Sequence, residues 1–516
     1  MNRRAVAATI LIIWLVTVAG LLRRHYWHPD TNPLADAAFS LPPGAKYFAV
    51  SLGDEQIGYA SSTIDTLADT LRVTDLMVLE LPVLGEIHRT SVRTEAVLSR
   101  SLHLRSFTAW LRSDGSRFSA SGRVLGDTAL TVELDTDGDL QTLTVRLEHP
   151  IVLATLMPLN LAFSGELEVG RSYRLAIFDP VLMQERDVTL TIAAESTFVV
   201  ADSAVLDSAT ARFVPVAWDT VQAWQIRQEG AAVPFHTWID DLGQVVRATS
   251  AAGFVMQRSA FEIAYENFRR DVESANASAP GRTAPSGDVI RQTAIASDVT
   301  LDRSRLDVLR VRLGGVELSG LDLDGAHQRL SADTLTVRRP AGDDLVAQYR
   351  VPARAGRFPE SLSSEPLIQS TDLRIRAQAR QIVGRERRPE RAARRLLDWV
   401  YQNLDKQVSV SVPSAVAVFE TRRGDCNEHT VLFVALARAV GLPARTAAGL
   451  VYLDGRFYYH AWPEVYLDGW VPVDPTFGQF PADATHLRFT IGGLASQMEL
   501  IRLVGRLTID VLETED

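Results

Sequence analysis

Alternating apolar and polar positions fill most of the first half of the chain. From about residue 46 to residue 270 they form short runs separated by turn residues, as in antiparallel sheets. The clearest example, TALTVELDTDGDLQTLTVRLEHP, has two alternating halves around Asp137 and Gly138. HTWIDDLGQVVRATS repeats the arrangement around Gly243. The pattern predicts an antiparallel β domain over residues 46–271.

The alternation is then interrupted and later resumes. VESANASAPGRTAPSG is rich in Ala, Ser, Pro and Gly, a composition typical of connecting segments. We therefore predict a linker over residues 272–297. Alternating runs return in LDVLRVRLGGVELSGLDLDG, which predicts a second β segment over residues 298–360.

The last block, residues 365–516, changes to helical periodicity. TDLRIRAQARQIVG and PERAARRLLDWVYQNL both space apolar residues by three and four positions. In the second run Leu396, Leu397, Val400 and Leu404 share one face, while arginines occupy the other. The pattern predicts amphipathic helices here. Together with the preceding strands, they predict a protein of the α+β class.

The N-terminus carries an uncharged apolar run at residues 5–22. As a helix it would extend roughly 27 Å, close to the thickness of the membrane hydrocarbon layer. A cleaved signal peptide is the alternative, but Arg23 and Arg24 stand where cleavage favours small residues. We expect an uncleaved N-terminal transmembrane helix at residues 1–24, followed by a spacer at residues 25–45. The short N-terminal tail favours a single-pass protein of the inner (plasma) membrane, with most of the chain periplasmic.

Composition narrows the function classes. The formal net charge of −10 and the pI near 5.6 argue against a nucleic-acid partner, because non-specific binding needs a basic face. A single cysteine excludes an intramolecular disulfide framework and a cysteine-cluster metal site. Nothing in the sequence predicts a metal ion or an organic cofactor. An enzyme, a binding module and a secreted structural β protein remain as function classes.

The lone cysteine, Cys426, lies in TRRGDCNEHT at the start of an apolar helical run. Asp425 is a favourable N-cap residue, and Glu428, three positions later, can accept its backbone N–H. The pattern therefore predicts a capping box, with Cys426 as the first helical residue. Gly441 ends the run, and His429 is expected to be a helix-surface or packing residue. A helix N-terminus favours thiolate. The alternative is a small buried residue that fills a gap.

A second candidate group lies in RFYYHAWPEVYLDGWVPVDPTFGQF, which reads as two strands. If Leu-Asp-Gly forms a three-residue loop, Gly469 adopts the left-handed conformation and Tyr466 pairs with Trp470. His460 and Asp474 then lie on one face as diagonal neighbours, roughly 7 Å apart. A two-residue loop would place them on opposite faces. A solvated cross-strand contact is the other alternative for this pair.

GDCNEHTVLFVALARAVGLPAR followed by YYHAWPEVYLDGWVPVDPT resembles the core of the bacterial transglutaminase-like superfamily, over about residues 390–480. The resemblance implies a papain-like transglutaminase core within residues 365–516, in which a nucleophile heads a helix packed on an antiparallel sheet. It implies that Cys426 is the nucleophile, His460 its base, and Asp474 the residue that orients His460.

The resemblance implies a cysteine-dependent acyltransferase or peptidase/amidase acting on amides of a protein or peptide substrate. With the predicted anchor, the expectation is a membrane-anchored thiol enzyme that uses a Cys-His-Asp triad. Hydrolysis and crosslinking both stay open, since either water or an amine can resolve the acyl-enzyme. The alternative is a non-catalytic extracytoplasmic binding or scaffold protein that uses its β region.

Overall fold

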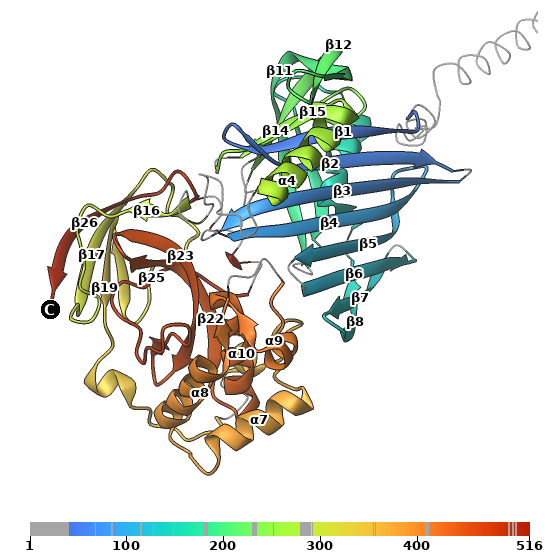
Figure 1. The fold of residues 1–516 in the computed structure, drawn as a ribbon. Coiled ribbons are helices and arrows are strands. Elements are labelled where there is room, and N and C mark those ends of the chain that lie inside the picture. The colour runs from blue at the N-terminus through green and yellow to red at the C-terminus, as the bar shows by residue number, and fades with distance from the viewer. Residues whose placement is uncertain are drawn as a thin grey trace, which may run out of the picture.

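The computed structural model describes residues 41–516 apart from short gaps at 68, 84–85, 114–115, 127, 148, 165, 180–183, 230–234, 251, 279–289, 291–292, 354–355, 357, 408–411, 494–495, 498–499 and 501–502. The predicted anchor and most of the predicted spacer lie outside the described residues. Within those residues, no helix combines the length and apolar character needed to cross a membrane. A large antiparallel sheet is followed by a unit of helices and smaller sheets, so the fold is α+β (Figure 1).

The first unit is one 15-stranded sheet with the order β8-β7-β6-β5-β4-β3-β2-β1-β15-β14-β13-β12-β11-β10-β9. Neighbours pair antiparallel, except that β9 and β10 are parallel. The strands are β1 (Gly44–Leu52), β2 (Glu55–Thr66), β3 (Thr70–Val83), β4 (Glu86–Ser99), β5 (Leu104–Ser113), β6 (Ser116–Leu125), β7 (Ala129–Thr136), β8 (Asp139–Arg146), β9 (Val152–Leu153), β10 (Ser172–Asp179), β11 (Gln184–Asp207), β12 (Arg212–Glu229), β13 (Phe235–Ile239), β14 (Val245–Ser250) and β15 (Phe254–Ser259).

Alternating side chains give this sheet its buried face. In β7, Leu130, Val132 and Leu134 are buried, as the period of two requires for one face of a strand. The rings of Phe107 on β5 and Phe178 on β10 lie 6.1 Å apart between centroids, although these strands are distant in the sheet order. The sheet therefore curls, and both of its halves contribute to one core (Figure 1).

The turns predicted from sequence are confirmed. Asp137 and Gly138 both have positive φ between β7 and β8, and Gly243 has positive φ between β13 and β14. A short π-helix (Glu262–Glu266) and α4 (Asn267–Ser278) follow β15 and pack against β2. Helix α4 continues into the stretch predicted as a linker, so the first part of that stretch is helical.

The second unit contains two sheets and the main helices. One sheet has the order β16-β23-β22-β25 with β24 paired to β23, and the other has the order β18-β19-β17-β26. The elements are β16 (Ile295–Ala296), β17 (Val308–Gly314), β18 (Gln328–Ser331), β19 (Thr334–Arg338), α6 (Pro359–Leu362), α7 (Leu373–Val383), α8 (Pro389–Asn403), β20 (Asp405–Lys406), α9 (Ala415–Thr421), β21 (Arg423–Gly424), α10 (Cys426–Ala439), β22 (Ala444–Leu453), β23 (Arg456–Tyr466), β24 (Trp470–Pro472), β25 (Leu487–Ile491) and β26 (Thr508–Glu515).

Helix α10 lies at the centre of this unit. Its residues from Glu428 to Arg438 are all buried, because α7, α8 and α9 cover one side and β22 and β23 the other (Figure 1). Helix α8 buries Leu396, Leu397 and Val400 on the face predicted from the 3–4 spacing. A helix buried all round has little freedom to shift, so its N-terminus is held at a fixed place over the sheet.

The segment predicted as a second β segment, residues 298–360, shares its core with the end of the chain. Strand β17 pairs with β19 and also with β26, the last strand. Leu309 and Val311 of β17 pack in one cluster with Leu450 and Phe457 of β22 and β23. These strands therefore support the sheet that carries the candidate site.

The two units contact each other through the β7–β8 hairpin. Gln141 Nε2 donates to the Pro366 carbonyl at 2.9 Å, and Gln369 Nε2 donates to Asp139 Oδ2 at 3.2 Å. Arg374 at the start of α7 lies 3.7 Å from Asp139. The acidic turn thus hydrogen-bonds to the second unit.

Candidate active site

Cys426 is the first residue of α10, as the sequence predicts. The Asp425 carboxylate accepts the backbone N–H of Asn427 at 2.8 Å, and the Glu428 carboxylate accepts the backbone N–H of Asp425 at 3.0 Å. Both halves of the predicted capping box are present. Gly424 has φ of 151° and approaches the Glu428 side chain so closely that a Cβ would collide with it. The entry to the helix is therefore tightly fixed.

The sulfur of Cys426 faces β23. It accepts the backbone N–H of Ala461, the residue after His460, and the side chain packs against the core under β22 and β23. Burial raises the pKa of the Cys426 thiol well above its usual value, and the charge of Asp425 raises it further. Both effects favour the neutral thiol and so oppose the helix dipole, which favours the thiolate. The thiol therefore needs a base close by.

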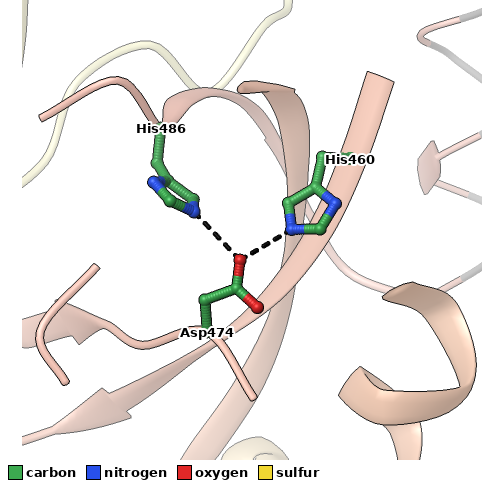
Figure 2. Close-up of side chains that lie close together, drawn as sticks. All are labelled: His460, Asp474 and His486. Atoms are coloured by element: carbon green, nitrogen blue, oxygen red, sulfur yellow. Dashed lines mark hydrogen bonds and ion pairs between the residues drawn. The ribbon is translucent and has the colours of Figure 1, made fainter. Parts of the chain in front are cut away.

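His460 on β23 and Asp474 in the loop after β24 are bonded to each other. His460 Nε2 lies 2.7 Å from Asp474 Oδ2, and both side chains are almost completely buried (Figure 2). The charge of Asp474 is also felt at the Cys426 thiol, where it raises the pKa. The structure thus brings the three residues predicted from sequence together at one end of α10.

The hairpin that carries this pair differs in part from its prediction. Tyr466 pairs with Trp470, as the three-residue loop requires, but Asp468 rather than Gly469 adopts positive φ. Strand β24 ends at Pro472, so Asp474 is not a strand neighbour of His460. It reaches the imidazole from a loop, where its backbone pairs with that of Gln479 in an isolated bridge.

Aromatic rings hold the imidazole of His460 in one plane. The Phe477 ring stacks on it at 4.9 Å with an interplanar angle of 20°. Trp462, fully buried on the same strand, stacks at 6.0 Å and 24°. With one nitrogen bonded to Asp474 and the ring plane fixed, the other nitrogen, Nδ1, has a defined direction.

The Asp474 carboxylate is ionised and fully engaged. Its Oδ1 accepts the backbone N–H groups of Thr476 at 2.7 Å and Phe477 at 3.1 Å. Burial alone would raise the pKa of Asp474, but the charges and hydrogen bonds of His460 and His486 outweigh it and hold that pKa well below its usual range.

His486, just before β25, is a neighbour that the sequence analysis missed. Its Nε2 lies 3.1 Å from Asp474 Oδ2, and its Nδ1 lies 3.2 Å from Asp483 Oδ1 (Figure 2). Burial alone would lower the pKa of His486, but its bonds to the two carboxylates raise it to about 9. The Arg303 guanidinium contacts Asp483 at 3.0 Å. A sequence signal existed in DATHLRF, where an acid and a histidine three residues apart precede an alternating run.

His460, Asp474 and His486 also have the composition of a metal site, with candidate ligand atoms within 4.8 Å of one another. Zinc ligands each lie about 2 Å from the ion at tetrahedral angles, which places two ligand atoms more than 3 Å apart. The 2.7 Å separation of His460 Nε2 and Asp474 Oδ2 is that of a hydrogen bond. The arrangement therefore fits a hydrogen-bonded carboxylate better than a metal ligand set.

His429 is a packing residue rather than a surface one. It is fully buried one turn into α10, and its Nδ1 lies 2.7 Å from the Asp425 carbonyl oxygen. Burial lowers the pKa of His429, so the ring is neutral and Nδ1 donates this bond. The contact strengthens the cap that holds Cys426.

Comparisons with known proteins identify the family of this part of the chain. Residues 376–475 match the Transglutaminase-like superfamily, and this part of the chain is a transglutaminase-like core. The matched range contains Cys426, His460 and Asp474. No curated protein is detectably similar to the chain.

Three solved structures share parts of the fold. A protein from Cytophaga hutchinsonii proposed to be a cysteine protease is 16% identical, covering 41% of this chain and 85% of its own, with a TM-score of 0.27. A beta-barrel-like protein of a domain of unknown function from Brucella abortus is 16% identical. The match covers 42% of this chain and 95% of that protein, with a TM-score of 0.29. The periplasmic domain of TgpA from Pseudomonas aeruginosa, bound to ethylmercury, is 17% identical. The match covers 36% of this chain and 89% of that domain, with a TM-score of 0.24. At these scores the likenesses carry no functional argument.

The buried charges make stability depend on pH in both directions. Because folding raises the pKa of His486, the protonated ring stabilises the folded state. This stabilisation is fully present below pH 6.5, the pKa of the unfolded side chain, and is lost as pH rises through about 9. The lowered pKa values of Asp474 and Asp483 mean that their contribution is lost as pH falls below about 4. We expect the free energy of unfolding to fall by roughly 3 kcal/mol between pH 6.5 and pH 9. Urea denaturation across this range measures it, and His486→Gln should remove most of the slope.

Proposed function

We propose that this protein is a membrane-anchored, transglutaminase-like thiol enzyme that transfers or hydrolyses acyl groups of peptide or protein amides. The observation that carries the proposal is the His460–Asp474 pair, bonded at 2.7 Å and located beside a single cysteine at the N-terminus of a buried helix. A nucleophile, a base and a group that orients the base are the parts that covalent acyl transfer requires. With the predicted anchor, we expect the reaction to take place outside the cytoplasm.

The proposed reaction begins with proton transfer from the Cys426 thiol to His460. Because Nε2 of His460 is bonded to Asp474, Nδ1 is the nitrogen that takes the proton. The sulfur attacks the carbonyl carbon of the amide, and the C–N bond breaks as His460 returns the proton to the departing amine. Water or a second amine then attacks the thioester, which releases the acid or the new amide and restores the thiol.

The negative charge that develops on the carbonyl oxygen needs donors nearby. The backbone N–H groups of the first helical turn have no partner within the helix, and that of Cys426 lies next to the reacting sulfur. We infer that this N–H is one donor of the oxyanion site. It also benefits from the positive end of the α10 dipole.

The presence of one cysteine makes a direct test possible. A short glutamine-containing peptide with a chloromethyl ketone in place of the side-chain amide reacts fastest with thiolate, and Cys426 is the only thiol in the chain. The proposed function predicts faster alkylation of the folded protein than of the urea-unfolded chain. A packing cysteine would react more slowly when folded, because burial raises its pKa. Intact-mass spectrometry over time measures both rates.

Cys426→Ala is the control and should give no adduct. If folded wild type reacts more slowly than unfolded chain, the enzyme interpretation is wrong, and the alternative of a non-catalytic extracytoplasmic binding or scaffold protein is preferred. Adding a biotin-labelled primary amine with an acyl donor then separates the two chemistries. Biotin incorporation indicates crosslinking, and release of free acid indicates hydrolysis.

A further inference from the structure

The carboxylate of Asp474 is shared by two imidazoles. His460 and His486 both direct Nε2 at the same oxygen, Oδ2, at 2.7 Å and 3.1 Å (Figure 2). His460 lies on β23 and His486 in the loop just before β25, and the two ring centroids are 5.9 Å apart. A catalytic base and the acid that orients it require one imidazole, that of His460. The imidazole of His486 is therefore an addition to the pair.

The surroundings of His486 fix its protonation state. Both of its ring nitrogens lie within hydrogen-bond distance of a carboxylate oxygen, Nε2 of Asp474 and Nδ1 of Asp483. A neutral imidazole carries one N–H, so its other nitrogen would direct a lone pair at a carboxylate oxygen. Only the imidazolium form donates to both, and the side chain is 1% exposed, so bulk solvent does not replace either carboxylate as its partner.

We propose that His486 is a positioning residue of this site: as an imidazolium it donates one N–H to Asp474 and the other to Asp483, and it thereby keeps Asp474 ionised and turned toward His460. The inference rests on the proposed thiol chemistry and adds a residue to it. His486 itself acts through Asp474 and not on the substrate.

The charges around His486 balance. Asp474 and Asp483 supply two negative charges, while His486 and Arg303 supply two positive ones. With this balance, Asp474 can orient His460 without placing an uncompensated negative charge beside the thiol. Without the charge of His486, Asp474 would act more strongly on Cys426, whose pKa it already raises, and less thiolate would form at neutral pH.

The position of Asp483 supports a specific role for His486 over simple packing. Asp483 Oδ1 also accepts the Thr485 hydroxyl at 2.5 Å and backbone N–H at 2.9 Å, and Oδ2 accepts from Gln479 at 2.8 Å. A buried acid held at this many points is costly if its only purpose is to fill space. Its location on the far side of His486 is what an imidazolium requires.

The experiment compares Cys426 alkylation by iodoacetamide in wild type and His486→Gln between pH 5 and pH 9. Glutamine keeps one donor for Asp474 but carries no charge. We expect the midpoint of the rising limb to move up by about one pH unit, so that the rate at pH 6 falls about tenfold. His327→Gln, which removes a largely buried histidine beside Asp344, is the matched control and should follow wild type.

Coinciding profiles for wild type and His486→Gln would overturn the positioning role while leaving the thiol enzyme intact. A wild-type thiol that reacts more slowly folded than unfolded would instead overturn the proposed function, and this inference with it. A second measurement does not depend on the variant folding. In wild type labelled with ¹⁵N-histidine, one imidazolium with two protonated nitrogens should persist at pH 8, and finding every histidine neutral would refute the proposal.

Discussion

Replacing His460 with alanine should lower the rate of Cys426 acylation by roughly 10²- to 10⁴-fold at neutral pH, the usual worth of a positioned general base. The reason lies in the thiol. Burial raises the pKa of Cys426 and the charge of Asp425 raises it further, so little thiolate forms without a base. Single-turnover reaction with an activated ester of a short peptide, followed by intact mass, measures this step. Raising the pH should restore part of the lost rate, because hydroxide then replaces the base.

Asp474→Asn tests the other half of the same pair. The amide keeps the size of the side chain but can direct its NH₂ group at His460 Nε2, which favours the tautomer with the proton on Nδ1. That tautomer cannot accept the thiol proton, so acylation should also be slow. Unchanged acylation in both variants would show that the sulfur reacts without this imidazole.

The start of α10 could be predicted because the signals that define it are local. Asp425 and Glu428 satisfy each other's neighbouring N–H groups within one helical turn, and the apolar run that follows is long enough to require burial. These relations depend on spacing in the chain and on little else. The placement of Cys426 at the first helical position followed from them and is confirmed.

The His460–Asp474 contact was predicted for a reason that the structure only partly supports. The strand register holds over the first three pairs, and the turn then differs in which residue takes positive φ. Beyond Pro472 the chain leaves the strand, and Asp474 returns to His460 through backbone pairing with Gln479. The register of a hairpin determines which residues are neighbours only where both strands remain extended. Pro472 has no N–H to donate to a further strand hydrogen bond, so the pairing ends there.

His486 and Arg303 could not be placed from sequence, because nothing local ties them to the site. Arg303 lies 180 residues from Asp483 along the chain, and the two meet only once β17, β19 and β26 pack beneath the sheet of β22, β23 and β25. Such contacts depend on the tertiary fold rather than on spacing. The family resemblance also ended before residue 483, so it offered no guide there.

The same sheet carries a buried ion network whose loss should unfold the site. The Glu464 carboxylate on β23 accepts from Arg445 Nε on β22 at 2.8 Å and from Arg488 Nη1 on β25 at 2.9 Å. Glu464 and Arg488 are almost completely buried, and Arg445 is mostly covered by stacking on Trp470. Three neighbouring strands are therefore joined through one carboxylate, two residues before the end of β23, where the hairpin that leads back to Asp474 begins.

Glu464→Ala should lower the free energy of unfolding of the second unit by about 3–5 kcal/mol, because two buried guanidinium groups lose their counter-charge. Urea titration followed by hydrogen exchange of α10 and β23 peptides measures this unit separately from the large sheet. The matched control is Glu513→Ala, which removes an exposed partner of Arg310 from β26 and should cost less than about 1 kcal/mol. Equal losses in the two variants would show that Glu464 is no more important than a surface ion pair. In that case the sheet would hold His460 in place through its apolar core alone.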